Sequence, residues 1–358
     1  MKGIRAWIAL LLSLVLAVGS VMPVTAAEET EAVQEVIACA DRDEAVVALR
    51  ESMEKRRQTI TVTFLSPVYD SQVPKDVYYA ALDHTGVPTQ GDYLRWGLRK
   101  CSIGIVAQEE AGQYRLTVTY TPVYYTTAEQ ESEMDAAVKA LLDQLDVYKA
   151  SDYEKVCAIY DYICANVIYD HWGLMTEDIM IYTPYAALIE KAAVCQGYAT
   201  LFYRLALELG VDARVISGTS KNQNHGWNIV RLNGKYYNLD STWDAEYAQK
   251  DRPYAYFLCS NANFENHTRK PDYATEEFMR VYPMADTDYA GQQPYLAGDL
   301  SGDGQLDETD VVYLLQYVLM PEAFPAVQAV DYTKDSRVNE DDVLYLLRHI
   351  LLPESFPL

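Results

Sequence analysis

The chain has 358 residues, of which 50% are hydrophobic and 23% are charged, so it can bury a large core, its length allows two or three domains, and disorder is excluded. Its 52 acidic residues outnumber the 29 Lys and Arg residues, which gives a formal net charge of −23. That charge has the wrong sign for coating a phosphate backbone or an anionic membrane, so we expect no nucleic-acid partner.

Residues 1–27 have the pattern of a cleaved secretory signal peptide. Lys2 and Arg5 precede an apolar run over residues 6–18, and small residues follow at its end. An uncleaved anchor is the alternative, but a Gly and a Pro after the run favour cleavage, and no later segment is long and apolar enough to span a membrane. We therefore expect a secreted protein, extracellular or in a cell-surface complex, without membrane insertion after signal cleavage.

Residues 28–290 read as an α/β region in which helical and strand patterns alternate. In chain order the patterns predict a helix, two strands and two amphipathic helices, over residues 45–53, 59–65, 114–123, 129–148 and 153–167. A second block of helix and strand patterns begins near Tyr185 and runs into a hairpin. Residues 291–298 are rich in Pro, Gly and Gln and read as a linker.

The six cysteines are too widely spread to suggest a disulfide framework. Cys157 and Cys164 lie seven residues apart in a helical pattern, which places them on one face but two turns apart, too far for a bridge. We interpret these two, together with Cys39, Cys101 and Cys259, as core thiols.

Cys195 stands at the start of an apolar helical pattern that ends at Gly210. At a helix N-terminus the macrodipole and the free N–H groups favour a thiolate, and the same N–H groups can hold an oxyanion. For this residue alone, a buried helix-capping cysteine is the better interpretation. Residues further along the chain change that balance.

A β-hairpin is predicted around Asn233–Gly234, the strongest short turn signal. A two-residue turn sets Trp227 opposite Asp240, and His225 then lies on the same face as a diagonal neighbour of Asp240. The carboxylate can orient the imidazole while the other ring nitrogen faces a thiol. Together with Cys195 this is the arrangement used for nucleophilic acyl transfer.

The segments around these three residues resemble a transglutaminase-like, papain-like core. The matching motifs are Val-Cys-Gln-Gly-Tyr-Ala, His-Gly-Trp-Asn and Asn-Leu-Asp-Ser-Thr-Trp-Asp, in that order, and the similarity covers about 153–244. The resemblance implies Cys195 as nucleophile, His225 as base and Asp240 as the orienting acid, with no cofactor for catalysis. Gly226 and Ser241 stand where many relatives carry Ala and Pro, and neither change touches a reacting group.

The resemblance leaves the acyl acceptor open, since relatives include cross-linking enzymes, peptidases, deamidases and non-catalytic interaction domains. A lysine amine attacking the thioester gives an isopeptide bond, whereas water gives hydrolysis, and the choice depends on water exclusion and cleft shape. We expect hydrolysis, because an exported enzyme on a degradative complex works in bulk water.

The last 60 residues contain an acidic internal repeat, in which residues 299–310 return as 331–342, each followed by the same apolar helical pattern. Each copy places oxygen ligands at the spacing of a calcium-binding loop. The ligands of the first loop are Asp299, Ser301, Asp303, Gln305, Asp307 and Asp310, and those of the second are Asp331, Thr333, Asp335, Arg337 and Asp342. Gln305 and Arg337 contribute their backbone carbonyls. Gly304 permits the sharp turn of the first loop. Ser336 replaces that glycine in the second, which predicts a weaker site.

This duplicated loop–helix unit over 299–358 resembles a dockerin module. It departs from the usual pattern at Ser336, and at Glu308-Thr309 and Glu340-Asp341, where many dockerins carry pairs of small hydroxyl residues. The resemblance implies two Ca²⁺ ions and, as partner, a cohesin domain of a scaffold protein. It also implies attachment to a bacterial extracellular complex, such as a cellulosome, that degrades polysaccharide.

The predicted fold class is therefore α+β, a papain-like or transglutaminase-like domain followed by a small all-α calcium-binding dockerin domain. The predicted function is a secreted cysteine peptidase or transamidase acting on protein or peptide amides. One alternative is a non-catalytic binding or structural subunit of the same complex. A glycoside hydrolase is a weaker alternative, because no pair of carboxylates stands out for that chemistry.

Overall fold

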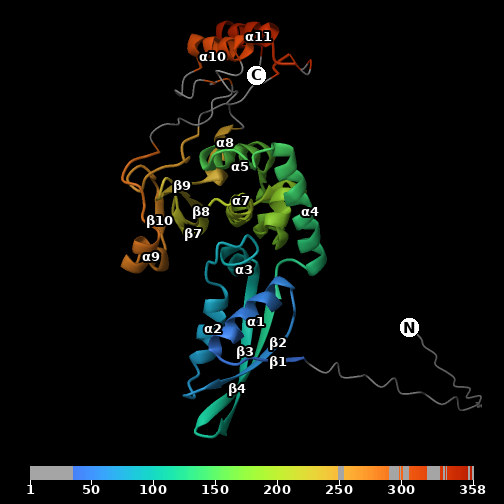
Figure 1. Ribbon diagram of the computed structural model, residues 1–358, viewed down its shortest axis with the longest axis vertical. Helices are drawn as coiled ribbons and strands as arrows, with labels where there is room; N and C mark the ends of the chain where they lie inside the picture. Colours follow the sequence, from blue (N-terminus) through green and yellow to red (C-terminus); the bar gives the residue numbers. More distant parts are fainter. Residues whose placement is uncertain are drawn as a thin grey trace, which may run out of the picture. The chain divides into compact units, whose positions relative to one another are not determined.

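The computed structural model (Figure 1) describes the greater part of the chain, and everything below concerns these residues: 35–248, 254–289, 298, 300, 306–320, 331–333, 335, 337–353 and 355–356. The predicted signal segment 1–27 and residues 291–297 of the predicted linker lie outside them. The mixed α and β class is confirmed. Among the described helices, none is long and apolar enough to cross a membrane.

The first sheet has the strand order β1-β2-β4-β3. Its strands are β1 Val36–Ala38, β2 Ile60–Ser66, β3 Leu98–Glu110 and β4 Gln113–Tyr124. Helices α1 Arg42–Glu54 and α2 Val73–Ala81 supply side chains that bury one face of this sheet, where Leu49 and Met53 share a core with Phe64 and Val118. The predicted helix and both predicted strands are confirmed, whereas β3, which pairs with β4 over its whole length, was not predicted.

Helices α4 Ala128–Leu145 and α5 Asp152–Asn166 confirm the two predicted amphipathic helices. Each begins with a capping box, in which Thr127 and Ser151 accept a backbone N–H while Gln130 and Glu154 accept the N–H of the cap residue. Helix α4 ends three residues before the predicted 148 because Asp146 adopts a left-handed conformation, with φ of 52°.

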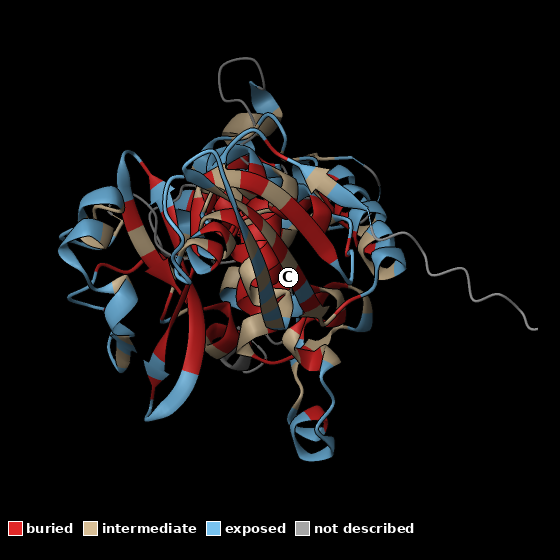
Figure 2. Ribbon diagram, turned by 90° about the horizontal axis from the view of Figure 1, so that it is seen from below, coloured by how far each residue is buried: buried red, intermediate tan, exposed pale blue. Residues whose placement is uncertain are grey.

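The second sheet is antiparallel with the order β10-β7-β8-β9. Its strands are β7 Ala213–Ser220, β8 Gln223–Leu232, β9 Lys235–Leu239 and β10 His267–Arg269. Helix α7 Cys195–Glu208 packs against it, and buried residues of both, red on the ribbon of Figure 2, join those of α4 and α5 in the largest core cluster.

Short elements connect these layers. They are α3 Asp92–Trp96, β5 Ile168–Tyr169, α6 His171–Thr176, the turns at Met180–Tyr182 and Pro271–Tyr273, the π-helix Ala186–Glu190, β6 Ala192–Ala193, α8 Ser241–Ala248 and α9 Glu276–Val281. Asp92 on α3 is fully buried and forms a bidentate pair with Arg214 of β7, at 2.7 and 3.1 Å. This charge-assisted pair ties α3 to the second sheet.

All six cysteines, each within the described chain, are free thiols. Cys39, Cys157, Cys164 and Cys259 are buried as predicted, but Cys101 is only half-buried on β3, so its assignment as a core thiol is corrected. Cys101 lies at the margin because β3 is the edge strand of its sheet.

Helices α10 Glu308–Leu319 and α11 Glu340–Leu351 contact each other through a small core that contains Leu314 and Leu346. The buried Asp310 carboxylate accepts the N–H groups of Leu300 and Asp307, and Asp342 accepts those of Thr333 and Asn339. In each repeat the aspartate thus accepts the N–H of the residue three positions before it and one further N–H from the loop.

Four predicted calcium ligands of the first loop lie outside the described residues: Asp299, Ser301, Asp303 and Gln305. In the second loop the Asp331 carboxylate accepts the Asp335 N–H, and the Asp335 carboxylate accepts the Arg337 N–H. These are hydrogen bonds of a tight acidic loop, and the calcium assignment stays a prediction.

Candidate active site

Cys195 is the first residue of α7 and is half-buried, as the helix-start prediction requires. Strand β6 leads into it through Val194, whose N–H donates to the Ile181 carbonyl at 2.9 Å. The adjacent Gln196 side chain donates to the Trp96 carbonyl at 2.9 Å. The first N–H groups of a helix have no carbonyl partner within the helix, so they are placed to donate hydrogen bonds to a developing oxyanion.

The predicted hairpin register is confirmed, because β8 and β9 pair Leu232 with Lys235 and Val230 with Tyr237. Asn233 and Gly234 form the turn, with φ of 50° and 82°. Asp240 directly follows β9, and the His225 Nε2 lies 2.6 Å from its Oδ2. The predicted imidazole–carboxylate hydrogen bond is therefore present.

The Cys195 side chain is a neighbour of the His225 imidazole and contributes to raising its pKa. Since Nε2 is bonded to Asp240, Nδ1 is the nitrogen left for the thiol. Burial alone would lower the pKa of His225, but the charge and hydrogen bond of Asp240 and the interaction with Cys195 raise it to about 10. The imidazole is therefore protonated at neutral pH, and a thiolate at Cys195 would be paired with it.

Asp240 is 1% exposed. Its Oδ1 accepts the N–H groups of Thr242 at 3.0 Å and Trp243 at 3.3 Å. Burial alone would raise the pKa of Asp240, but the charges and hydrogen bonds of His225 and His267 hold it well below its usual range. The carboxylate is thus ionised and fixed in orientation.

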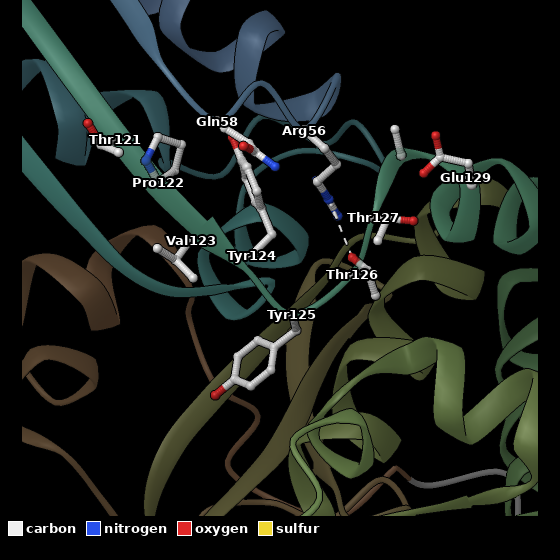
Figure 3. A pocket seen from close by; sticks show the side chains of 11 residues that line it. Arg56, Gln58, Thr121, Pro122, Val123, Tyr124, Tyr125, Thr126, Thr127 and Glu129 are labelled. Atoms are coloured by element: carbon white, nitrogen blue, oxygen red, sulfur yellow. Dashed lines mark hydrogen bonds between the residues drawn. The ribbon is translucent and has the colours of Figure 1, made fainter. Parts of the chain in front are cut away.

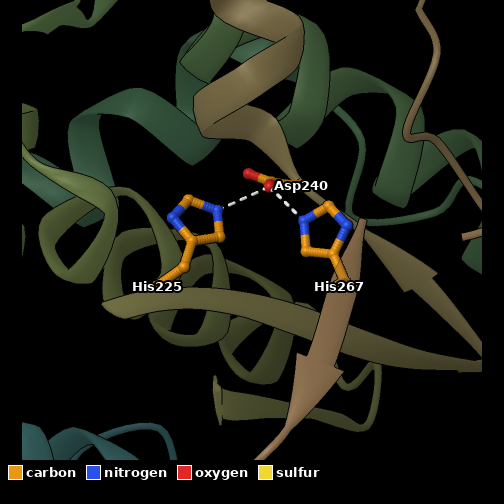
Figure 4. A group of neighbouring side chains, drawn as sticks. All are labelled: His225, Asp240 and His267. Carbon is orange, nitrogen blue, oxygen red and sulfur yellow. Dashed lines mark hydrogen bonds and ion pairs between the residues drawn. The ribbon is translucent and has the colours of Figure 1, made fainter. Parts of the chain in front are cut away.

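His267, which no motif of the sequence singled out, also lies in this site. Its Nε2 is 2.9 Å from the same Asp240 Oδ2, and its Nδ1 is 2.8 Å from the Glu265 carbonyl oxygen. Figure 4 shows the two imidazoles on either side of Asp240. His267 lies on a strand of three residues, too short to show a periodic pattern, and only the pairing of β10 with β7 brings it to Asp240.

The other histidines bond elsewhere. The His84 ring lies 3.1 Å from the Tyr203 hydroxyl and 3.0 Å from Asp212 Oδ1, and His349 Nδ1 lies 2.7 Å from the Phe356 carbonyl oxygen. His171 begins α6 and is exposed.

Two histidines and a carboxylate are also a metal-ligand set, since one ligand atom from each of His225, Asp240 and His267 lies within 4.8 Å of the others. A tetrahedral zinc ion with bonds of about 2.1 Å would hold nitrogen and oxygen ligands roughly 3.4 Å apart. The N···O distances here are 2.6 and 2.9 Å, which are hydrogen-bond lengths. The geometry fits an orienting acid between two imidazoles.

Aromatic rings and one lysine border the site. The Trp243 ring lies 5.4 Å from that of His225, and its indole N–H donates to the Ser220 hydroxyl at 3.1 Å. The Lys221 amine lies 3.5 Å from the centre of the Trp243 ring. Tyr236 is 4% exposed and packs in a core cluster.

A pocket elsewhere in the fold is lined by residues from the end of β4 and the start of α4, together with Arg56 and Gln58 (Figure 3). Arg56 pairs with Glu131 at 2.6 Å and donates to the Thr126 hydroxyl at 3.4 Å. Its charge is therefore neutralised within the protein, and the pocket contains none of the residues of the Cys195 site.

Two glycines on the paired strands β7 and β8, Gly218 opposite His225 and Gly226 opposite Ser217, should respond differently to alanine. A Cβ on Gly218 would meet the Thr268 carbonyl and lie 2.6 Å from the Trp227 ring, whereas a Cβ on Gly226 would meet only the Ile216 carbonyl, at 3.6 Å. We expect Gly218→Ala to displace β10, and with it His267, at a cost of about 1–3 kcal/mol. Gly226→Ala should be neutral or slightly stabilising. Urea unfolding of both variants tests this, and equal effects would contradict it.

Comparison with known proteins agrees with the resemblance seen in the sequence motifs. The family model described as the transglutaminase-like superfamily matches residues 139–241. The kyphoscoliosis peptidase of Homo sapiens is 30% identical over 133 residues, which cover 34% of this chain and 20% of that protein. That of Mus musculus is 30% identical over 129 residues, 33% of this chain and 20% of that protein.

A crystal structure of a TGase shares 17% sequence identity, covers 58% of this chain and 59% of that chain, and gives a TM-score of 0.30. This chain spans about a fifth of the length of the two curated relatives. The family match includes the segments that carry Cys195, His225 and Asp240. Residues 139–241 form a domain of the transglutaminase-like superfamily.

Proposed function

We propose that this protein is a cysteine-dependent acyl-transfer enzyme that acts on protein or peptide amides. The observation that carries the proposal is the placing of three groups: the Cys195 thiol at the start of α7, the neighbouring His225 imidazole, and the buried Asp240 carboxylate to which that imidazole is hydrogen-bonded. Each group has the neighbour that its chemical role requires.

In the proposed reaction the Cys195 thiolate attacks the amide carbonyl carbon, and the resulting oxyanion is held by N–H groups at the start of α7. The amide C–N bond breaks as His225 gives its proton to the leaving amine, which leaves a thioester on Cys195 and a neutral imidazole. His225 then accepts a proton from water or from an incoming amine as either attacks the thioester. Water yields a carboxylate, an amine yields a new amide, and the thiolate is regenerated.

We favour hydrolysis over amine transfer. The two curated relatives, each 30% identical, are named as peptidases. The matched segment covers only a fifth of their length. Transamidation remains the second outcome of the test.

Selective alkylation of Cys195 tests the nucleophile. Burial raises the pKa of the other five thiols, to about 11 for Cys101 and about 12 for Cys259. At pH 5.5 to 6, iodoacetamide should therefore add one carbamidomethyl group, which peptide mapping places on Cys195, and Cys195→Ala should take up none. Alkylation of all thiols at similar rates would remove the basis for an activated nucleophile and favour a non-catalytic binding subunit.

An assay on a peptide substrate shows whether water or an amine is the acyl acceptor. Peptide release from casein without uptake of a primary-amine probe indicates a peptidase, and covalent attachment of the probe to glutamine side chains indicates a transamidase. Neither product, over a broad peptide library, would leave the domain as a binding module.

We further propose that residues 1–27 direct secretion and that residues 299–358 bind two Ca²⁺ ions and dock on a cohesin domain of an extracellular scaffold. The support is the sequence repeat, together with the equivalent burial of Asp310 and Asp342 at the start of α10 and α11. An enzyme attached in this way would work beside polysaccharide-degrading partners.

Calcium titration of the full chain by calorimetry should show two classes of site, the first loop being tighter because it alone has glycine at its turn. Asp299→Ala should remove the tighter class and the matched Asp331→Ala the weaker one. No heat of binding, or helical circular dichroism that is insensitive to both Ca²⁺ and chelator, would contradict the calcium proposal.

A further inference from the structure

The two ring nitrogens of His267 both face hydrogen-bond acceptors. Nδ1 is 2.8 Å from the Glu265 carbonyl oxygen, which can only accept, and Nε2 is 2.9 Å from the ionised Asp240 carboxylate, which also only accepts. A neutral imidazole has one N–H and satisfies one of these contacts. Both contacts together require a proton on each nitrogen, so the geometry describes His267 as an imidazolium.

The surroundings of His267 suit a buried cation. Its side chain is 1% exposed. The ring stacks on Phe264 with centroids 3.9 Å apart, and Trp227 and Tyr256 lie at 5.0 and 5.3 Å. Aromatic rings around a desolvated cation stabilise it, and the paired carboxylate offsets the cost of burial.

The charges of the cluster balance only if His267 is charged. In the reactive state Cys195 and Asp240 are negative and His225 is positive, so a second cation makes this buried group neutral. Other titratable or charged groups near this cluster come from several elements: Asp244 of α8, Tyr160 of α5, Tyr256, Arg269 of β10 and Lys221 beside Trp243. Among these, Asp244 and Tyr160 bond each other, and the Arg269 guanidinium donates to Asn238 and Asn261, so none of these three pairs with Asp240.

We propose that His267 is a positioning residue whose fixed positive charge neutralises Asp240, so that His225 can release its proton and act as base in the second half of the reaction. This inference rests on the proposed acyl-transfer function. Acylation of Cys195 removes the thiolate that holds a proton on His225, and Asp240 is then the remaining anion bonded to that imidazole. With His267 charged, Asp240 attracts the His225 proton less strongly, and the imidazole becomes available to accept a proton from water or an amine.

The charge state can be measured without any assay of activity. In full-length Cys195→Ala protein labelled with ¹⁵N-histidine, long-range ¹H–¹⁵N spectra should show both nitrogens of His267 protonated at pH 7 to 8. The signals of His267 are assigned as those that disappear when His267→Gln is added to the Cys195→Ala protein. A spectrum in which His267 has one protonated nitrogen at this pH overturns the proposal.

A second experiment follows the two half-reactions. His267→Gln keeps an N–H donor toward Asp240 but removes the charge. The burst of acyl-enzyme should persist, deacylation at pH 7 should slow by about threefold to tenfold, and its pH midpoint should move upward by about one unit.

Phe264→Leu is the matched control, because it removes the ring stacked on His267 and leaves the charge in place. Because the imidazolium keeps its pairing with Asp240, this variant should move the pH midpoint of deacylation much less than His267→Gln does. If both variants lower acylation and deacylation equally without moving the pH midpoint, His267 has only a structural role and the proposal fails. If wild type forms no acyl-enzyme at all, the proposed function fails, while the spectra still decide the charge on His267.

Discussion

Cys195→Ser is expected to lower kcat/KM on a peptide substrate by at least about 10³-fold, because the serine hydroxyl does not ionise beside His225 as a thiol does. His225→Ala should cause a loss of similar size, since the two residues act as a unit. The double variant should be no worse than either single one. Initial rates on the peptide that the wild type cleaves best are the measurement.

Cys101→Ser is the matched control for this substitution. Cys101 is a half-buried thiol on the edge strand β3 of the first sheet, and its thiol donates to the Ser102 carbonyl. Its replacement should leave kcat/KM within about twofold of wild type. If Cys195→Ser retains the activity of the wild type, Cys195 is not the nucleophile and the enzyme assignment is wrong.

Asp240→Asn is expected to cost about 10²- to 10⁴-fold in kcat/KM and also to destabilise the fold. The carboxylate accepts from two imidazoles and two backbone N–H groups, and an amide would turn an N–H₂ donor toward one of these donors. Loss of the orienting acid changes the preferred tautomer of His225, which accounts for the loss of rate. Breaking a buried charge pair costs about 3 kcal/mol in unfolding free energy.

The destabilisation should depend on pH in a defined direction. The pKa of Asp240 is lower in the folded than in the unfolded protein, so its contribution is present above the unfolded value of about 4 and is lost as the pH falls. The pKa of His225 is raised to about 10, so its contribution is full below the unfolded value of about 6.5 and is lost as the pH rises toward 10.

The difference in unfolding free energy between wild type and Asp240→Asn should therefore be largest near pH 5 to 6.5 and smaller at pH 3 and pH 9.5. Urea unfolding at these values, followed by circular dichroism, is the measurement. A difference that is constant over this range would mean that the two groups do not titrate as a pair in the folded protein.

Local features of the sequence determined much of this site. Asn233–Gly234 imposes a two-residue turn with positive φ, and the two-residue side-chain period of a strand then brings His225 and Asp240 to one face. The apolar pattern after Cys195 places that thiol at a helix start without any information from outside the segment. These predictions held because each depends on residues that are close together in the chain.

Tertiary structure alone decided the features that depend on distant pairing. Strand β3 is recognisable through its partner β4, and Cys101 is half-buried because β3 lies at the sheet edge. His267 lies 27 residues after Asp240, on a strand of three residues that β7 holds in place, and Gly218 permits that approach. A strand this short has too few residues to show a hydrophobic period. Apart from the stacked ring of Phe264, the groups that position His267 are β7 and the rings of Trp227 and Tyr256, which lie outside its own segment.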